Sequence, residues 1–192
     1  MKNLKAKELT SYFQKFADKT DLKEILKIVK ANSEGKIWLI GGFLYRGIVY
    51  EMYGGELPSP DFDFIVEKRK ERLNLPSNWT ALNNKYGNPK FRNSKDSVDF
   101  VPLDTVLSLK LRKFEPTIEN YLSGTPLTIQ SIAYDCIRKQ VMGEVGAGAI
   151  LNKTVGINYI RSAEHEAKLK NITVNDLILK KAGSLKFEPI LY

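Results

Sequence analysis

Cysteine and histidine are almost absent from this chain, since Cys136 and His165 are the only examples in 192 residues. With one cysteine the chain can form neither an intrachain disulfide nor a cysteine-based zinc site. With one histidine it cannot build a metal site from several histidines. The apolar neighbours of Cys136 predict a buried residue, and the charged neighbours of His165 predict a surface residue.

Long apolar runs are also absent. No stretch approaches the ~18 consecutive apolar residues that a membrane-spanning helix needs. Residues 1–5 lack the apolar block of a secretion signal and lead directly into an amphipathic pattern. We therefore expect a cytoplasmic protein.

Acidic residues are outnumbered by basic ones. The chain has 30 Lys and Arg against 22 Asp and Glu, which gives a net charge of +8. A basic protein favours an anionic partner such as nucleic acid or nucleotide phosphates. The alternative is an ordinary lysine-rich surface, because the lysines are scattered along the chain.

Helical spacing of apolar residues near both ends divides the chain into three parts. Residues 1–35 predict two amphipathic helices, residues 36–158 contain the expected strands, and residues 159–192 return to helical spacing. With 43% hydrophobic residues, a chain of this length can bury a core as one medium domain or as a domain with a small appendage.

Strands and helices are both expected in the central part. The expected strands cover residues 36–40, 62–67, 90–92, 97–101, 127–136 and 139–142. Helices are expected over residues 43–53, 77–86, 105–113 and 117–122, and a short one is expected to begin at residues 146–148. The strands at 90–92 and 97–101 read as a hairpin.

Two carboxylates open the strand expected over residues 62–67. Side chains two residues apart in a strand point to the same face, so Asp61 and Asp63 project together, about 7 Å apart along the backbone. Phe62 and Phe64 point the other way, toward the core. Two carboxylates this close repel each other unless cations lie between them, which favours a site for divalent metal and phosphate. The alternative is a strand that opens on a turn, where aspartate is common.

A third acid, Asp99, is flanked by apolar residues in the strand expected over residues 97–101. If that strand lies beside the strand of Asp61 and Asp63, all three carboxylates share one face. They could then hold two metal ions, and Asp99 could take the proton of an attacking hydroxyl. The alternative is that Asp99 is only the polar face of an alternating hairpin.

Two glycines separate the strand expected over residues 36–40 from the helix that follows. Gly41 and Gly42 let the backbone approach a phosphate closely, and the following helix offers amide donors at its N-terminus. Arg46, one turn further on, can hold a phosphate or pair with a neighbouring carboxylate. A tight turn without any ligand fits the two glycines equally well.

These motifs together resemble a known family. Residues 39–46 read LIGGFLYR, residues 60–66 read PDFDFIV and residues 127–135 read LTIQSIAYD. They resemble the head domain of class II CCA-adding enzymes and bacterial poly(A) polymerases, in the DNA polymerase beta-like nucleotidyltransferase superfamily. The resemblance covers about residues 36–158.

The resemblance implies an α+β fold, in which a mixed sheet is backed by helices and the catalytic acids lie on one open face. Residues 36–158 would be the nucleotidyltransferase head, with residues 1–35 as a helical extension packed on it and residues 159–192 as a short neck-like helical segment. Asp61 and Asp63 would bind magnesium, and Asp99 would be the third carboxylate. Gly41, Gly42 and Arg46 would hold a nucleoside triphosphate.

The chain departs from the family at several places. Gly47 follows Arg46 where the family usually has aspartate, residues 124–126 read GTP where it has Arg-Arg-Asp, and Gln130 replaces its usual asparagine. We expect no body or tail domain after residue 158.

The predicted function is the transfer of a nucleoside monophosphate from a nucleoside triphosphate to an acceptor hydroxyl, with two Mg²⁺ ions and release of pyrophosphate. The expected acceptor is an RNA 3′ end. The alternatives are a protein or small-molecule acceptor, a nucleotide- or RNA-binding module that has lost turnover, and a subunit whose helical ends dock on a partner protein or a second copy.

Overall fold

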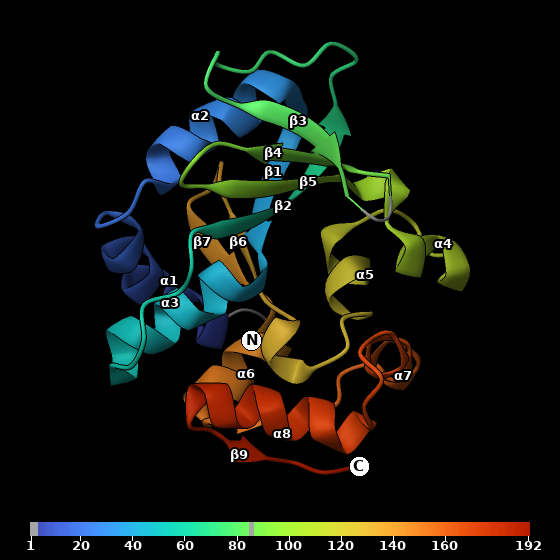
Figure 1. Ribbon diagram of the computed structural model, residues 1–192. Helices are drawn as coiled ribbons and strands as arrows, with labels where there is room; N and C mark the ends of the chain where they lie inside the picture. The colour runs from blue at the N-terminus through green and yellow to red at the C-terminus, as the bar shows by residue number, and fades with distance from the viewer. Residues whose placement is uncertain (1–3, 85–86) are drawn as a thin grey trace.

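The computed structural model describes residues 4–84 and 87–192, which form a seven-stranded sheet with helices on both faces (Figure 1). The strand order is β3-β4-β5-β2-β1-β6-β7, and all neighbours are antiparallel except β2 and β5, which are parallel. The strands are β1 (Ser33–Ile40), β2 (Asp61–Arg69), β3 (Thr80–Asn83), β4 (Pro89–Arg92), β5 (Ser97–Pro102), β6 (Ala133–Asp135) and β7 (Gln140–Met142). The expected α+β fold with a mixed sheet is confirmed.

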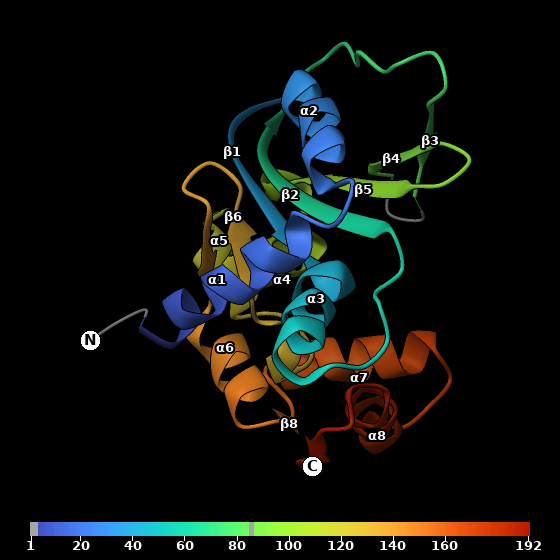
Figure 2. The same cartoon turned by 90° about the vertical axis from the view of Figure 1, so that its left-hand side faces the viewer.

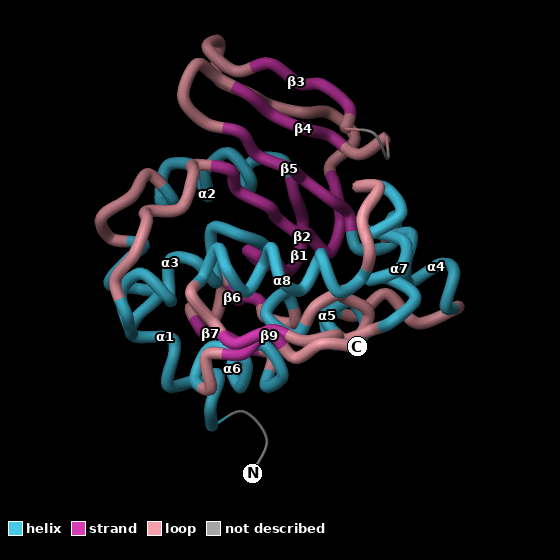
Figure 3. The backbone as a smooth tube through the Cα atoms, turned by 60° about the horizontal axis from the view of Figure 1, so that its bottom comes forward, coloured by secondary structure: helices cyan, strands magenta, loops and turns pink. Residues whose placement is uncertain are grey.

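Helices cover both faces of the sheet. Figure 2 shows α1, α2 and α3 together on one face of the sheet, with α4 and α5 behind it. Figure 3 shows α6, β9 and α8 next to one another, where the chain ends. The helices are α1 (Leu4–Ala17), α2 (Leu22–Asn32), α3 (Gly41–Tyr53), α4 (Leu107–Arg112), α5 (Ile118–Leu122), α6 (Glu144–Leu151), α7 (Ile160–Leu169) and α8 (Val174–Leu185). A small second sheet pairs β8 (Thr154–Val155) with β9 (Glu188–Pro189). In the part of the chain described, no helix is long and apolar enough to cross a membrane.

The alternation along β2 separates two hydrophobic clusters. Phe62 and Phe64 are buried in the main core, together with residues of α1, α2, α3 and α6. Ile65 faces the other way and belongs to a smaller cluster with Trp38 and residues of α4 and α5. Because Asp63 shares the face of Ile65, it lies on the side of the sheet that carries α4 and α5.

Both ends of the chain contribute to the main core, α1 through Phe13 and Phe16 and α8 through Leu177 and Ile178. Helix α1 packs closely on α3, and a Cβ on Gly47 would lie 2.3 Å from the Phe16 ring. This contact gives a physical reason for glycine at a position where the resembled family usually has aspartate. The division of the chain at residues 35 and 158 stays a prediction.

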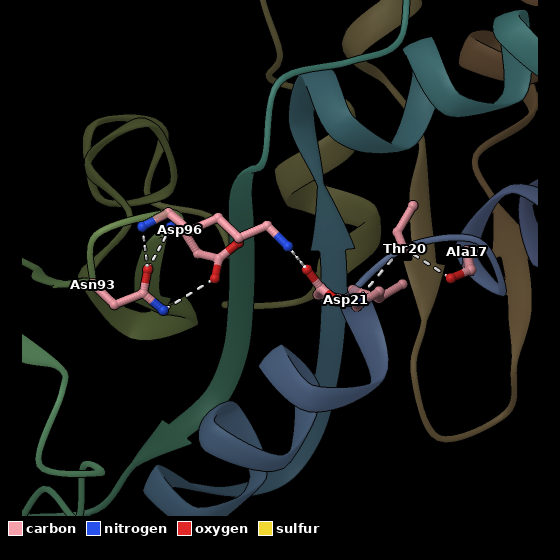
Figure 4. A network of polar contacts seen from close by, with 7 residues as sticks. Ala17, Thr20, Asp21, Asn93 and Asp96 are labelled. Carbon is pink, nitrogen blue, oxygen red and sulfur yellow. Dashed lines mark hydrogen bonds and ion pairs between the residues drawn. The ribbon is translucent and has the colours of Figure 1, made fainter.

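The turn between β4 and β5 is fixed at both sides (Figure 4). Asn93 Oδ1 accepts the backbone N–H groups of Lys95 at 2.7 Å and Asp96 at 2.5 Å, and Asn93 Nδ2 donates to Asp96 Oδ2 at 3.0 Å. The Lys95 ammonium forms an ion pair with Asp21, between α1 and α2. These contacts hold the turn directly before β5, the strand that carries Asp99.

Two expected elements are wrong. Residues 77–86 were expected to be helical, but β3 occupies Thr80–Asn83 and residues 85–86 lie outside the described part. Hydrogen bonding to β4 outweighs the weak helical spacing at this sheet edge. The strand expected over residues 127–136 is reduced to β6, since Thr128–Gln130 forms a 3₁₀ turn in which the Gln130 side chain accepts the Leu127 N–H at 3.0 Å.

Candidate active site

The three predicted carboxylates share one face of the sheet. Asp63 on β2 is the direct partner of Asp99 on β5, and Asp61 is paired with Ser97 two residues earlier. Side chains of partnered residues point to the same side, as do residues two apart along one strand. Asp61 is exposed, whereas Asp63 and Asp99 are half-buried. The expectation that the strand of Asp99 lies beside that of Asp61 and Asp63 is confirmed; the roles of the three acids stay predictions.

Asp63 lies in an environment that disfavours its negative charge. Burial is the main cause, and the neighbouring carboxylates of Asp99 and Asp61 add to it, so the pKa of Asp63 is raised to about 6 from an ordinary value of 3.8. The positive charge of Lys90 acts in the opposite direction but does not cancel the rise. A cation bound at this carboxylate would remove the penalty of its ionised form.

Asp99 already has a cationic partner. Its Oδ2 atom lies 2.7 Å from the Lys90 ammonium, and its Oδ1 atom accepts a hydrogen bond from Asn84 Nδ2 at 3.1 Å. Lys90 was not among the candidates from the sequence. The signal was present, because Lys90 precedes the buried Phe91 on β4 and therefore faces the same side of the sheet as the acids.

Gly41 meets a carboxylate at close range. Its φ of +76° is strained for any residue with a side chain, and a Cβ there would lie 2.1 Å from Asp63 Oδ2. The group that lies closest to Gly41 in the structure is thus the Asp63 carboxylate, and the approach of Gly41 and Gly42 to a phosphate stays a prediction. Gly42 is different, because a Cβ there would have ordinary contacts of 3.8 Å or more.

Arg46 contacts the C-terminal helix. Its Nη2 atom donates to Ser184 Oγ on α8 at 3.1 Å, and the adjacent Tyr45 hydroxyl lies 2.8 Å from the Lys181 ammonium, also on α8. Within the described chain, Arg46 forms no ion pair with Asp61 or Asp63. Of the two alternatives for Arg46, pairing with these carboxylates is therefore wrong, and phosphate binding stays a prediction.

An open cleft of about 1070 Å³ lies over the carboxylates, between the sheet and helices α4 and α5. Among the described residues it is lined by Asp63, Asp99 and Gly41, but not by Asp61, Gly42 or Arg46. Basic side chains line it at Lys90, Arg92 and Lys110, and apolar or aromatic ones at Leu82, Val106, Leu107 and Tyr121. A cleft with carboxylates at its floor, cations on its walls and an apolar side suits a ligand that carries phosphates and a planar ring.

The acids fit a metal only in part. Asp61 and Asp63 supply hard oxygen atoms of the kind that Mg²⁺ prefers, and Asp63 is destabilised without a cation. In residues 4–84 and 87–192, however, no group of three or more acidic, histidine or cysteine side chains is arranged to hold a metal ion. Asp61 and Asp63 are therefore the candidate pair for a metal ion, whereas Asp99 is directed to Lys90 and Asn84.

The chain is similar to a CCA-adding enzyme in complex with CTP, with 13% identity and a TM-score of 0.54 over 81% of this chain. It is also similar to the Thermotoga maritima CCA-adding enzyme complexed with tRNA, with 11% identity and a TM-score of 0.51 over 88% of this chain. The fold is similar to the nucleotidyltransferase head of CCA-adding enzymes.

The similarity to these two structures covers only part of each of them. The chain spans 38% and 46% of the length of these two proteins. At such low identity the likeness concerns the fold alone. Neither a family model nor a curated protein sequence matches the chain.

The segment that departs most from the resembled family, residues 124–126, has its own packing. Gly124 lies under the Arg112 guanidinium, since a Cβ there would be 2.6 Å from Arg112 Nη2. Asn158 Nδ2 lies within 3.1 Å of the Thr125 carbonyl and hydroxyl oxygens and of the Leu122 carbonyl. Thr125 and Pro126 line the cleft without offering a charge. The cations of the cleft therefore come from β4 and α4.

Two minor candidates behave as expected. His165 is exposed on α7, and Cys136 is buried, with burial raising the pKa of its thiol to about 12. A thiol with such a pKa stays protonated at neutral pH and is a poor nucleophile.

Proposed function

We propose that this protein is a metal-dependent nucleotidyltransferase, which transfers a nucleoside monophosphate from a nucleoside triphosphate to an acceptor hydroxyl and releases pyrophosphate. The observation that carries the proposal is the side-by-side placement of Asp63 and Asp99 at the floor of a cleft with basic walls. The similarity of the fold to CCA-adding enzymes supports it independently of these residues.

Each residue has a role in this proposal. Asp61 and Asp63 hold Mg²⁺, which supplies Lewis-acid stabilisation of the phosphate oxygens. Asp99 is the third carboxylate and the candidate base for the proton of the attacking hydroxyl. Gly41 shapes the floor by admitting the Asp63 carboxylate beside the backbone. Gly42 and Arg46, at the start of α3, are proposed to contact the triphosphate.

The structure adds basic residues to this set. Lys90, Arg92 and Lys110 line the same cleft as Asp63 and Asp99. The positive charges of Arg92 and Lys110 attract a polyanionic triphosphate and take the part of the arginines that residues 124–126 lack, whereas Lys90 is paired with Asp99. The apolar patch at Leu82 and Leu107 is the candidate surface for the base.

The proposed acceptor is an RNA 3′ end. The net charge of +8 favours a polyanion, and two of the similar structures are described as complexes of CCA-adding enzymes with CTP and with tRNA. A protein or small-molecule hydroxyl remains the alternative acceptor. A partner protein or second copy bound through the helical ends stays a prediction.

The test is incorporation of each of the four radiolabelled nucleoside triphosphates into total RNA with Mg²⁺. Loss of a metal ligand removes several kcal/mol of transition-state stabilisation, so Asp63→Asn should lower incorporation by at least about 100-fold. Asp104→Asn is the matched control, since Asp104 is exposed and does not line the cleft. Incorporation that survives in Asp63→Asn, or is absent from the wild type, contradicts the proposal for RNA.

A second candidate function is a nucleotide-binding module without turnover. The ion pair between Lys90 and Asp99 favours it, because it occupies a carboxylate that the two-metal prediction assigns to metal. Triphosphate binding without pyrophosphate release, from RNA or any other acceptor, would support this candidate over the enzyme.

A further inference from the structure

Three charged side chains form a row across three neighbouring strands. Lys90 on β4 is the direct antiparallel partner of Asp99 on β5, and Asp99 is the direct parallel partner of Asp63 on β2. Neighbouring strands lie about 4.8 Å apart, so the row places one positive and two negative charges at successive steps along the floor of the cleft. All three residues line that cleft.

The carboxylate of Asp99 is engaged at both oxygen atoms. Lys90 contacts Oδ2 at 2.7 Å, and Asn84 donates to Oδ1 at 3.1 Å. The Lys90 and Asp99 side chains are only 27% and 23% exposed, so water screens their interaction less than on an open surface. A divalent cation bound to Asp99 would lie beside the ammonium group, and two cations at that distance repel each other strongly in a partly buried site.

The carboxylates of Asp61, Asp63 and Asp99 do not converge on a common point. Asp61 is exposed, and its Oδ2 atom accepts a hydrogen bond from Ser59 at 3.2 Å, outside the lining of the cleft. Asp99 lies between Asp63 and Lys90 in the row, and its carboxylate is directed toward Lys90. This division agrees with the finding that no three ligating side chains come together in the described residues.

We propose that the Lys90 ammonium takes the place of one of the two metal ions that the sequence predicted. The chain then binds a single divalent cation at Asp61 and Asp63, and Lys90 neutralises Asp99. This inference rests on the proposed function, because it assigns how the charge of the same carboxylates is balanced. Lys90 acts here as a positioning residue that holds the Asp99 carboxylate through the 2.7 Å ion pair and keeps it away from metal.

The test is the number of Mn²⁺ ions bound per chain without nucleotide, measured by electron paramagnetic resonance of free Mn²⁺. We expect the wild type to bind one ion and Lys90→Gln to bind two. The affinity for the second ion should be at least about tenfold higher in Lys90→Gln than in the wild type, because the repulsion from the ammonium group is gone. Lys90→Arg keeps the charge and should bind one ion. Lys110→Gln, the same change on another wall of the cleft, should also bind one. Lys90→Met provides the same comparison if the glutamine variant does not fold.

The outcomes separate this inference from the proposed function. The inference that Lys90 replaces a metal ion is overturned if the wild type binds two ions, or if the folded Lys90→Gln and Lys90→Met variants bind only one. Either result leaves the metal site of the proposed function intact. No Mn²⁺ bound by the wild type, or binding that persists in Asp61→Ala/Asp63→Ala, overturns the metal site of the proposed function and the inference with it.

Discussion

Replacing Asp63 by asparagine should stabilise the metal-free protein at neutral pH. The pKa of Asp63 is about 6 in the folded protein, against an ordinary value of 3.8. One pKa unit corresponds to about 1.36 kcal/mol, so ionising Asp63 costs the folded state at most about 3 kcal/mol relative to the unfolded chain. Asparagine has nearly the same shape and carries no charge, so Asp63→Asn should recover a large part of this free energy.

The sign of the pH dependence follows from the raised pKa. Between the two pKa values the folded protein holds a proton at Asp63 that the unfolded chain has already lost. The free energy of unfolding contributed by this group therefore falls as the pH rises from about 4 to about 6, and it stays low above that window. In Asp63→Asn this fall should be absent.

The assay is urea denaturation of the wild type and Asp63→Asn in chelator, at several pH values from about 4 to about 8. Asp104→Asn is the matched control, because it removes an exposed carboxylate outside the cleft. Adding Mg²⁺ should reduce the difference in the free energy of unfolding between the wild type and Asp63→Asn at neutral pH, since a cation stabilises the ionised carboxylate of the wild type and not the amide of the variant. Equal stability of the wild type and Asp63→Asn at pH 8 in chelator would refute the argument that Asp63 is an electrostatically strained acid.

Two further predictions concern glycines. Gly41→Ala places a Cβ 2.1 Å from Asp63 Oδ2 at a φ of +76°, so the free energy of unfolding, measured by thermal denaturation, should fall by about 1–3 kcal/mol. A fall no greater than that of Gly42→Ala would contradict the close contact. Gly47→Ala drives a Cβ to 2.3 Å from the Phe16 ring and should cost about 1–3 kcal/mol. Phe16→Leu should relieve part of the Gly47→Ala effect in the double variant, and strictly additive losses would show that the two residues do not clash.

The sequence was sufficient to predict the local part of the site. Alternation of acids and phenylalanines along β2 determines which face each side chain occupies, and the same alternation places Asp99 on one face of β5. These are short-range properties of a strand, and they need no knowledge of the fold.

The long-range part could not be predicted in the same way. Lys90 meets Asp99 because β4 pairs with β5, and Asp99 meets Asp63 because β5 adds to β2 in parallel. Arg46 meets Ser184, which is 138 residues away. No local pattern contains these pairings, and the edge strand β3 was missed because its identity depends on hydrogen bonds to β4.

The close contact at Gly41 lies between these two cases. The motif predicted that the backbone at Gly41 and Gly42 can approach a phosphate closely, and the structure shows that the Asp63 carboxylate lies beside Gly41. Asp63 lies there because Ile40, the residue before Gly41, pairs with Asp63 across β1 and β2.

The measurement that tests the central claim most directly is Mg²⁺-dependent release of pyrophosphate from each nucleoside triphosphate, with RNA as the acceptor. The account predicts release by the wild type and by Asp104→Asn, and a loss of at least about 100-fold in Asp63→Asn. Release that is equal in the wild type and Asp63→Asn would contradict the assignment of the catalytic carboxylate, and no release with any triphosphate would contradict RNA nucleotidyl transfer.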